Sequence, residues 1–279
     1  IISGTLTGNT SIQTLINSLQ SYQKQMMGGD STQTDTTYKN LDMKANFTVV
    51  NSPIISEVFV PELNRLDTIT LQMAFKPSEE ILRVDLKAPG ILYGESEISQ
   101  LFLEMDATRT NTDIQFGFDR VTSGPIDIYA TRLNLNLNGG KGEASLSIKD
   151  AQQQDVFYTA LDISKAGPST LLKVSLDKLI LNSKPWTIPA SNEIRIDPDL
   201  TRFTDFTLTR NGQKIAVESM VEDEKEKMKL AFSNFNLEAI FSILNAGSSP
   251  ISGTLGGNVV LNDLTGTPAF VADVTLNNL

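Results

Sequence analysis

The sequence predicts an all-β protein, elongated and mostly antiparallel, with two short amphipathic helices. Two observations support this prediction. Apolar and polar residues alternate over most of the chain from about residue 41 onward, which is typical of strands with one buried face and one solvated face. Turn motifs rich in glycine, asparagine and proline separate the alternating runs, so consecutive strands are expected to form hairpins.

The alternating runs correspond to about fifteen short strands in series. The clearest of them cover residues 43–49, 69–75, 82–88, 101–107, 114–118, 126–130, 133–137, 144–148, 172–176, 194–196, 215–217, 228–232 and 270–276. Their intervening positions carry polar side chains such as Arg83, Asp85, Asn134 and Asn136. Turns are expected at Ser123-Gly124-Pro125, at Asn138-Gly139-Gly140, at Asn211-Gly212 and at the charged run 222–227.

Two stretches depart from alternation and have apolar residues at helical spacing. The first, Ser11–Met27, is followed by Gly28-Gly29 and a polar loop to about residue 40, and the second covers about 237–245. We therefore divide the chain into residues 1–40 (strand-turn, helix, polar loop), 41–250 (a curled sheet region ending in a helix) and 251–279 (the start of the next strand-turn element). All three are expected to be parts of one continuous sheet.

One-sided strands need a cover, because each buried Leu, Ile or Phe side chain gains roughly 1.5–3 kcal/mol over exposure. Two short helices are too few to cover so many strands. Three solutions stay open: two sheets face to face, a closed barrel, or one long sheet folded over so that its apolar face lines the inside. The third creates an apolar groove wherever the sheet stays open.

Composition excludes several functions. The formal charge of −10, from 33 acidic and 23 basic residues, argues against nucleic-acid binding and against anionic membrane surfaces. Cysteine and histidine are both absent, which removes thiolate and imidazole nucleophiles and the usual zinc ligands. We therefore expect no enzyme, no metal site and no cofactor. The chain opens at Ile1 without a signal-like segment, so we expect an internal piece of a longer protein.

Three local features have a simple structural interpretation. Asp197 and Asp199 are interpreted as a solvated turn in preference to calcium ligands. Trp186 is interpreted as an aromatic packed at a sheet edge in preference to a ligand-stacking residue. The octapeptides at 2–9 and 251–258 differ only at Thr7 against Gly256, and each is interpreted as strand, tight glycine turn, strand.

The C-terminal third resembles TamB-like proteins. The residues that support the resemblance are a Trp-led strand at Trp186, an Asn-x-Ile-x-Ile strand from Asn192, a Gly-Gln hairpin at Gly212, an Asn-Leu-x-x-Ile helix from Asn236 and the Ile-x-Gly-x-Leu-x-Gly element from Ile251. This family is similar to AsmA-like and bridge-like lipid-transfer proteins. The resemblance implies a long sheet curled into a taco-like trough with an apolar interior.

The resemblance further implies an internal segment of a periplasm-spanning protein, held in the inner membrane by an N-terminal helix outside this piece. Its implied role is passive phospholipid transfer between inner and outer membranes and outer-membrane biogenesis. The implied partners are phospholipid acyl chains and, through parts outside this piece, an Omp85-family outer-membrane barrel similar to TamA. Candidate lipid-lining residues are Phe116, Phe118, Leu133, Leu135, Leu137, Phe270, Val274 and Leu276.

Other interpretations stay open. The lining candidates are equally compatible with a sealed core. The sheet is also compatible with a chaperone or scaffold that assists outer-membrane protein or autotransporter assembly by β-augmentation. A third alternative is a β-sandwich adhesin or glycan-binding module with no apolar channel.

Overall fold

The computed structural model describes residues 2–8, 41–108, 110–197, 200–222, 225–238, 252–262 and 269–278. The chain divides into two compact units, Ile1–Gln153 and Gln154–Leu279. The predicted all-β fold is confirmed, because the described chain is mostly strand and its strands pair antiparallel. The strands form two sheets, and neither sheet closes on itself. The predicted helices at 11–27 and 237–245 lie outside the described residues, except for Leu237 and Glu238.

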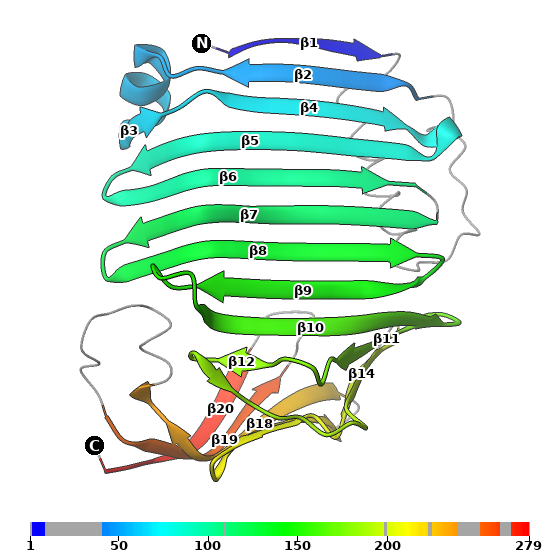
Figure 1. Cartoon of the computed structure of the whole chain (residues 1–279), viewed down its shortest axis with the longest axis vertical. Coiled ribbons are helices and arrows are strands. Elements are labelled where there is room, and N and C mark those ends of the chain that lie inside the picture. Colours follow the sequence, from blue (N-terminus) through cyan, green and yellow to red (C-terminus); the bar gives the residue numbers. More distant parts are fainter. Residues whose placement is uncertain are drawn as a thin grey trace. The chain divides into compact units, whose positions relative to one another are not determined.

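The first unit is a ladder of long antiparallel strands (Figure 1). The ladder order is β1 (Ile2–Gly8), β2 (Met43–Val49), β4 (Ile69–Lys76), β5 (Ile81–Tyr93), β6 (Ser96–Ala107), β7 (Asn111–Ser123), β8 (Ile126–Asn138) and β9 (Lys141–Lys149). A short strand, β3 (Leu63–Leu66), pairs with the far end of β5. Two single turns, a π-helical one at Ile54–Phe59 and a 3₁₀ one at Pro77–Glu79, complete the described elements of this unit.

The turns form where the sequence predicts them. Gly139 and Gly140, between β8 and β9, have φ of 57° and 78°, which is the left-handed backbone that a two-residue hairpin turn requires. Asn211 and Gly212 adopt the same conformation, with φ of 47° and 78°. Each motif thus sets the register of the hairpin that it closes.

A crease crosses strands β5 to β8 at one level. The residues on it lie opposite one another across the sheet: Pro89, Gln100, Asp119 and Ala130, each flanked by regular pairs. Gln100 and Ala130 have φ of 51° and 36°, which interrupts the extended backbone in two of the four strands. The strands bend together toward this end (Figure 1). The apolar alternation of the sequence changes phase at the same level, from Ala88 to Ile91 on β5 and from Phe118 to Val121 on β7.

The second unit contains two groups of strands. The first group is β10 (Asp155–Ala166), β11 (Ser169–Val174), β14 (Glu193–Ile196) and β15 (Thr201–Thr204), with β12 (Ile180–Leu181) and β13 (Lys184–Pro185) paired beside β10. The second is a five-stranded sheet ordered β16 (Thr207–Arg210), β17 (Gln213–Glu222), β18 (Lys225–Asn236), β19 (Thr254–Asn262) and β20 (Ala269–Asn277).

A sealed core joins these two groups. Its buried members are Val174, Leu179, Trp186, Ile188 and Phe235, with half-buried neighbours from β16 to β19. Trp186 is 6% exposed, its ring centroid is 6.0 Å from that of Phe235, and its backbone N–H donates to the Leu179 carbonyl. The interpretation of Trp186 as a packing residue is confirmed, and its place is within the core.

The structure corrects the interpretation of the repeated octapeptides. Gly4 and Gly8 lie in β1, and Gly256 and Gly257 lie in β19, so no tight turn divides either strand; Gly253, with a φ of 120°, directly precedes β19. A side chain at Gly257 would meet the Asp273 carbonyl oxygen at 2.2 Å, and one at Gly8 would meet the Met43 side chain at 2.7 Å. These glycines therefore permit close approach of the next strand.

Candidate functional site

The registers of the first unit place its alternating apolar residues on one continuous surface. One cross-strand row runs through Met43, Phe75, Leu82 and Ala107, each opposite the next. We call this surface the apolar face. Its residues are Ile2, Leu6, Met43, Ala45, Phe47, Val49, Ile69, Leu71, Met73, Phe75, Leu82, Val84, Leu86, Ala88, Leu101, Leu103, Met105, Ala107, Ile114, Phe116, Phe118, Leu133, Leu135, Leu137, Ala144 and Leu146.

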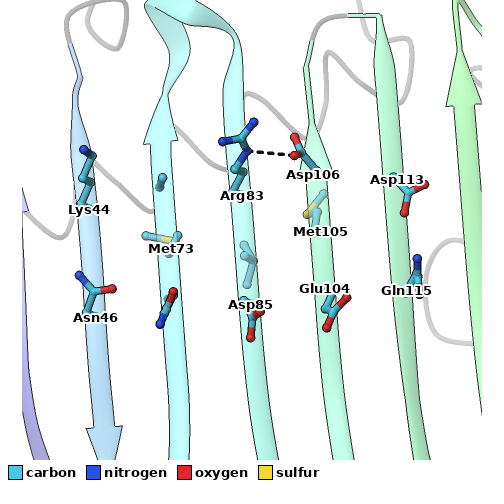
Figure 2. Close-up of a pocket in the computed structure, with 13 residues that line it drawn as sticks. Lys44, Asn46, Met73, Arg83, Asp85, Glu104, Met105, Asp106, Asp113 and Gln115 are labelled. Atoms are coloured by element: carbon cyan, nitrogen blue, oxygen red, sulfur yellow. Dashed lines mark hydrogen bonds and ion pairs between the residues drawn. The ribbon is translucent and has the colours of Figure 1, made fainter.

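The opposite surface of the same strands is polar. Figure 2 shows a hollow of about 500 Å³ that is lined by its charged and amide side chains on β2, β4, β5, β6 and β7, together with Met73, Ala74, Val84 and Met105. Arg83 Nε donates to Asp106 Oδ2 at 2.9 Å across neighbouring strands. Both side chains are more than half exposed, so this ion pair contributes little to stability. The polar surface is thus solvated, and the sheet is one-sided.

The side chains of the apolar face are buried near one end of the strands and half-exposed near the middle of the strands. Phe75 and Ala107 are fully buried, in a cluster with Leu41, Met43 and Leu82. Toward β8 the side chains are intermediate, and Leu133 is 38% exposed. Within the described part of the chain, the only elements that make extensive contacts in this unit are sheet neighbours or adjoining turns.

Five of the predicted lining residues come together on this face. Phe116 lies opposite Leu133, and Leu133 lies opposite Leu146 on the next strand. The other three are neighbours on the same two strands: Phe118 two residues beyond Phe116, and Leu135 and Leu137 beyond Leu133. Among these five, only Leu133 is classed as exposed, and the others are half-buried.

The remaining three lining candidates belong to the second unit. Phe270, Val274 and Leu276 lie on β20, with exposed fractions of 71%, 41% and 48%. They alternate along one strand, so their side chains share one of its faces. The other five lining candidates, on β7 and β8, belong to the first unit, so the two sets are described separately.

Sequence reasoning missed an arrangement on the polar surface. Arg132 lies over the Phe102 ring, with its guanidinium carbon 5.2 Å from the ring centroid, across the intervening Gly117. A side chain at Gly117 would meet Phe102 at 2.9 Å and Arg132 at 2.8 Å. Arg132 also donates to the Phe118 carbonyl and to Asp119. The sequence signal that could have predicted this contact is an aromatic residue, Phe102, at a polar position of the alternating pattern on β6, opposite a glycine, Gly117, within β7.

Asp197, one of the two carboxylates considered as calcium ligands, is engaged in ion pairs. Asp197 accepts hydrogen bonds from Ser169, Arg195 and Arg202, and these donors hold its pKa below the usual value. Asp199 lies outside the described residues. In the described ranges no group of three or more acidic residues is arranged to hold a metal ion. No helix among those ranges has the length and apolar character needed to cross a membrane.

Comparisons with known proteins give no match: neither a protein-family model, nor a curated protein, nor a solved structure is similar to this chain.

Proposed function

We propose that the apolar face of the first unit holds lipid acyl chains, and that the chain is a segment of a TamB-like, periplasm-spanning protein that passively transfers phospholipid between the two membranes. One observation supports the acyl-chain proposal above others. A continuous apolar surface of Leu, Ile, Phe and Met side chains crosses the sheet from β2 to β9, and it is only half-buried at its middle, with Leu133 38% exposed. The membrane context rests on the sequence resemblance.

The physical reason is the cost of apolar surface in water. Monomeric proteins rarely expose contiguous apolar patches beyond a few hundred Å² without a function for them. Acyl chains match such a surface because they are flexible, apolar and free of hydrogen-bonding groups. Met73 and Met105, which lie on the face near its buried end, are side chains that adapt to irregular partners. Specificity is expected to be low, and no covalent step is involved.

The test is native mass spectrometry of the chain after exposure to phospholipid vesicles. We expect bound phospholipid on the unmodified chain and a several-fold loss of it in Leu135→Lys, because a charge opposes apolar contact. Asn134→Lys is the matched control, since Asn134 is the next residue on β8 and is exposed on the opposite surface.

Circular dichroism establishes that each variant is folded. Leu133→Lys is a second variant that is better tolerated, because Leu133 is already 38% exposed. The proposal is overturned by a lipid-free unmodified chain, or by folded Leu133→Lys and Leu135→Lys proteins that carry as much lipid as Asn134→Lys.

A further inference from the structure

The hollow on the polar surface of the first unit has a regular lining. Two cross-strand rows form most of it, and each row takes one residue from each of the strands β2, β4, β5, β6 and β7 (Figure 2). The first row is Asn46, Gln72, Asp85, Glu104 and Gln115, and the second is Lys44, Ala74, Arg83, Asp106 and Asp113, with each residue opposite the next. Because neighbouring strands lie about 5 Å apart, the two rows present polar groups at even spacing over about 20 Å.

The size of the hollow is that of a ligand site. Its volume is about 500 Å³, within the range of roughly 300–1,000 Å³ that is typical of small-molecule sites. Ala74 has the smallest side chain of the two rows and lies between Lys44 and Arg83, so space is left above the sheet at this position. All five strands lie within the ladder, where each has a neighbouring strand on both sides.

The lining has hydrogen-bonding capacity that the described part of the protein does not use. Asn46, Gln72 and Gln115 are exposed, and none of their carboxamide groups bonds to another described residue. Each carboxamide provides two donor hydrogens and one acceptor oxygen. These groups are therefore available to a ligand.

The chemistry of the lining matches a neutral ligand that carries many hydroxyl groups. Carboxylates only accept hydrogen bonds, Lys44 and Arg83 only donate them, and the carboxamides do both. A hydroxyl group donates and accepts, so it matches every polar position of the two rows. The rows hold four carboxylates and two cationic groups, so their net charge is negative and they repel phosphate-bearing ligands.

We propose that the hollow binds an extended, neutral oligosaccharide that lies across the strands from β2 to β7. One hexose unit of an extended β-linked chain is about as long as the spacing between neighbouring strands, about 5 Å, so successive units meet successive strands. The sugar hydroxyls then lie beside both rows. This inference goes beyond lipid binding and does not depend on it, because the hollow and the apolar face lie on opposite surfaces of the sheet.

The probes are cellopentaose and chitopentaose, two extended β-linked chains, added to the full chain and followed by saturation-transfer-difference NMR and isothermal titration calorimetry. None of the described residues that line the hollow is aromatic, so affinity rests on solvated hydrogen bonds, and we expect a Kd on the order of 1 mM for at least one pentaose. Cellobiose reaches fewer strands, and maltopentaose is curved by its α-linkages. Each is expected to bind about fivefold more weakly or less, which corresponds to the loss of about one hydrogen bond.

Two variants test the site itself. Ala74→Leu fills the hollow, and Gln72→Ala removes a free carboxamide from the first row. We expect each to weaken pentaose binding by about fivefold. Glu143→Ala is the matched control, because Glu143 is exposed on the same polar surface, on β9, and is not among the residues that line the hollow. Circular dichroism establishes that each variant is folded.

Three results overturn the proposal: no saturable binding of either pentaose, binding of cellobiose or maltopentaose as tight as that of the pentaoses, or undiminished binding by folded Ala74→Leu and Gln72→Ala proteins. Phospholipid binding is expected to be the same in these variants as in the unmodified chain. The oligosaccharide and acyl-chain proposals therefore fail independently of each other.

Discussion

Replacing Asn192 by alanine tests how the second unit is held together. The pairing of β11 with β14 ends at Leu172 opposite Ile194, and two positions further in that register Val174 lies opposite Asn192. There the Asn192 side chain takes the place of the backbone: its Oδ1 accepts from the Val174 N–H at 2.7 Å, and its Nδ2 donates to the Val174 carbonyl at 3.2 Å. The same Nδ2 donates to the Pro189 carbonyl at 2.8 Å.

The magnitude follows from these three bonds. Asn192 is 1% exposed, so water cannot replace it without rearrangement. A buried N–H left without a partner costs about 1–3 kcal/mol, and each lost neutral hydrogen bond contributes about 1 kcal/mol. We therefore expect Asn192→Ala to lower the free energy of unfolding by about 3 kcal/mol.

The assay is urea denaturation followed by tryptophan fluorescence. Trp186 is the single tryptophan of the chain and lies in the core that the Asn192 segment closes, so its emission reports this unit alone. Asn134→Ala is the control, because Asn134 is exposed and makes one long hydrogen bond to Ser145; it should change stability by less than about 0.5 kcal/mol. A shift below about 1 kcal/mol in Asn192→Ala would refute the view that this carboxamide substitutes for backbone.

Two further predictions concern other parts of the chain. Phe75→Ala, at a fully buried position of the first unit, is expected to cost about 3–5 kcal/mol by circular dichroism while the Trp186 emission transition is unchanged. A cost under about 1 kcal/mol would show that the cluster is not packed. Asp197 has a lowered pKa in the folded state, so its stabilisation is present above its unfolded pKa of about 3.9 and is lost as the pH falls through the folded value. Asp197→Asn should therefore differ from the unmodified chain in denaturation midpoint at neutral pH, and the difference should shrink as the pH falls below about 3.9 and through the lower folded pKa; a constant difference would contradict this.

The alternation of apolar and polar residues made most of the fold predictable from the sequence. Each apolar run from Met43 to Leu146 sits on a strand, and a period of two determines which side chains share a face once antiparallel pairing is assumed. That is why Phe116 and Leu133, ten or more positions apart along the chain, could be grouped before any register was known. Hairpin motifs supplied the pairing order, because consecutive strands joined by two-residue turns have to be neighbours.

Features that depend on a single cross-strand contact were not visible in the sequence. The contact of the Arg132 guanidinium with the Phe102 ring depends on the register that places Gly117 between them. The carboxamide of Asn192 reads as an ordinary turn residue until Val174 is placed opposite it. The crease was only partly predictable. The sequence shows the change of phase in the separate apolar runs, but only the alignment of Gln100 and Ala130 across the ladder shows that the strands share a single crease.

The two units manage similar one-sided strands in different ways, and this difference supports a functional assignment to the first. In the second unit the segment around Trp186 and Ile188 fills the space between two groups of strands, so a residue such as Phe235 is 8% exposed. In the first unit the middle of the apolar face reaches 38% exposure at Leu133. Both arrangements use leucine, isoleucine and phenylalanine, so composition does not separate them. Among the described residues, what separates them is the segment around Trp186 and Ile188, and the half-exposed surface of the first unit is where an apolar ligand gains most from contact.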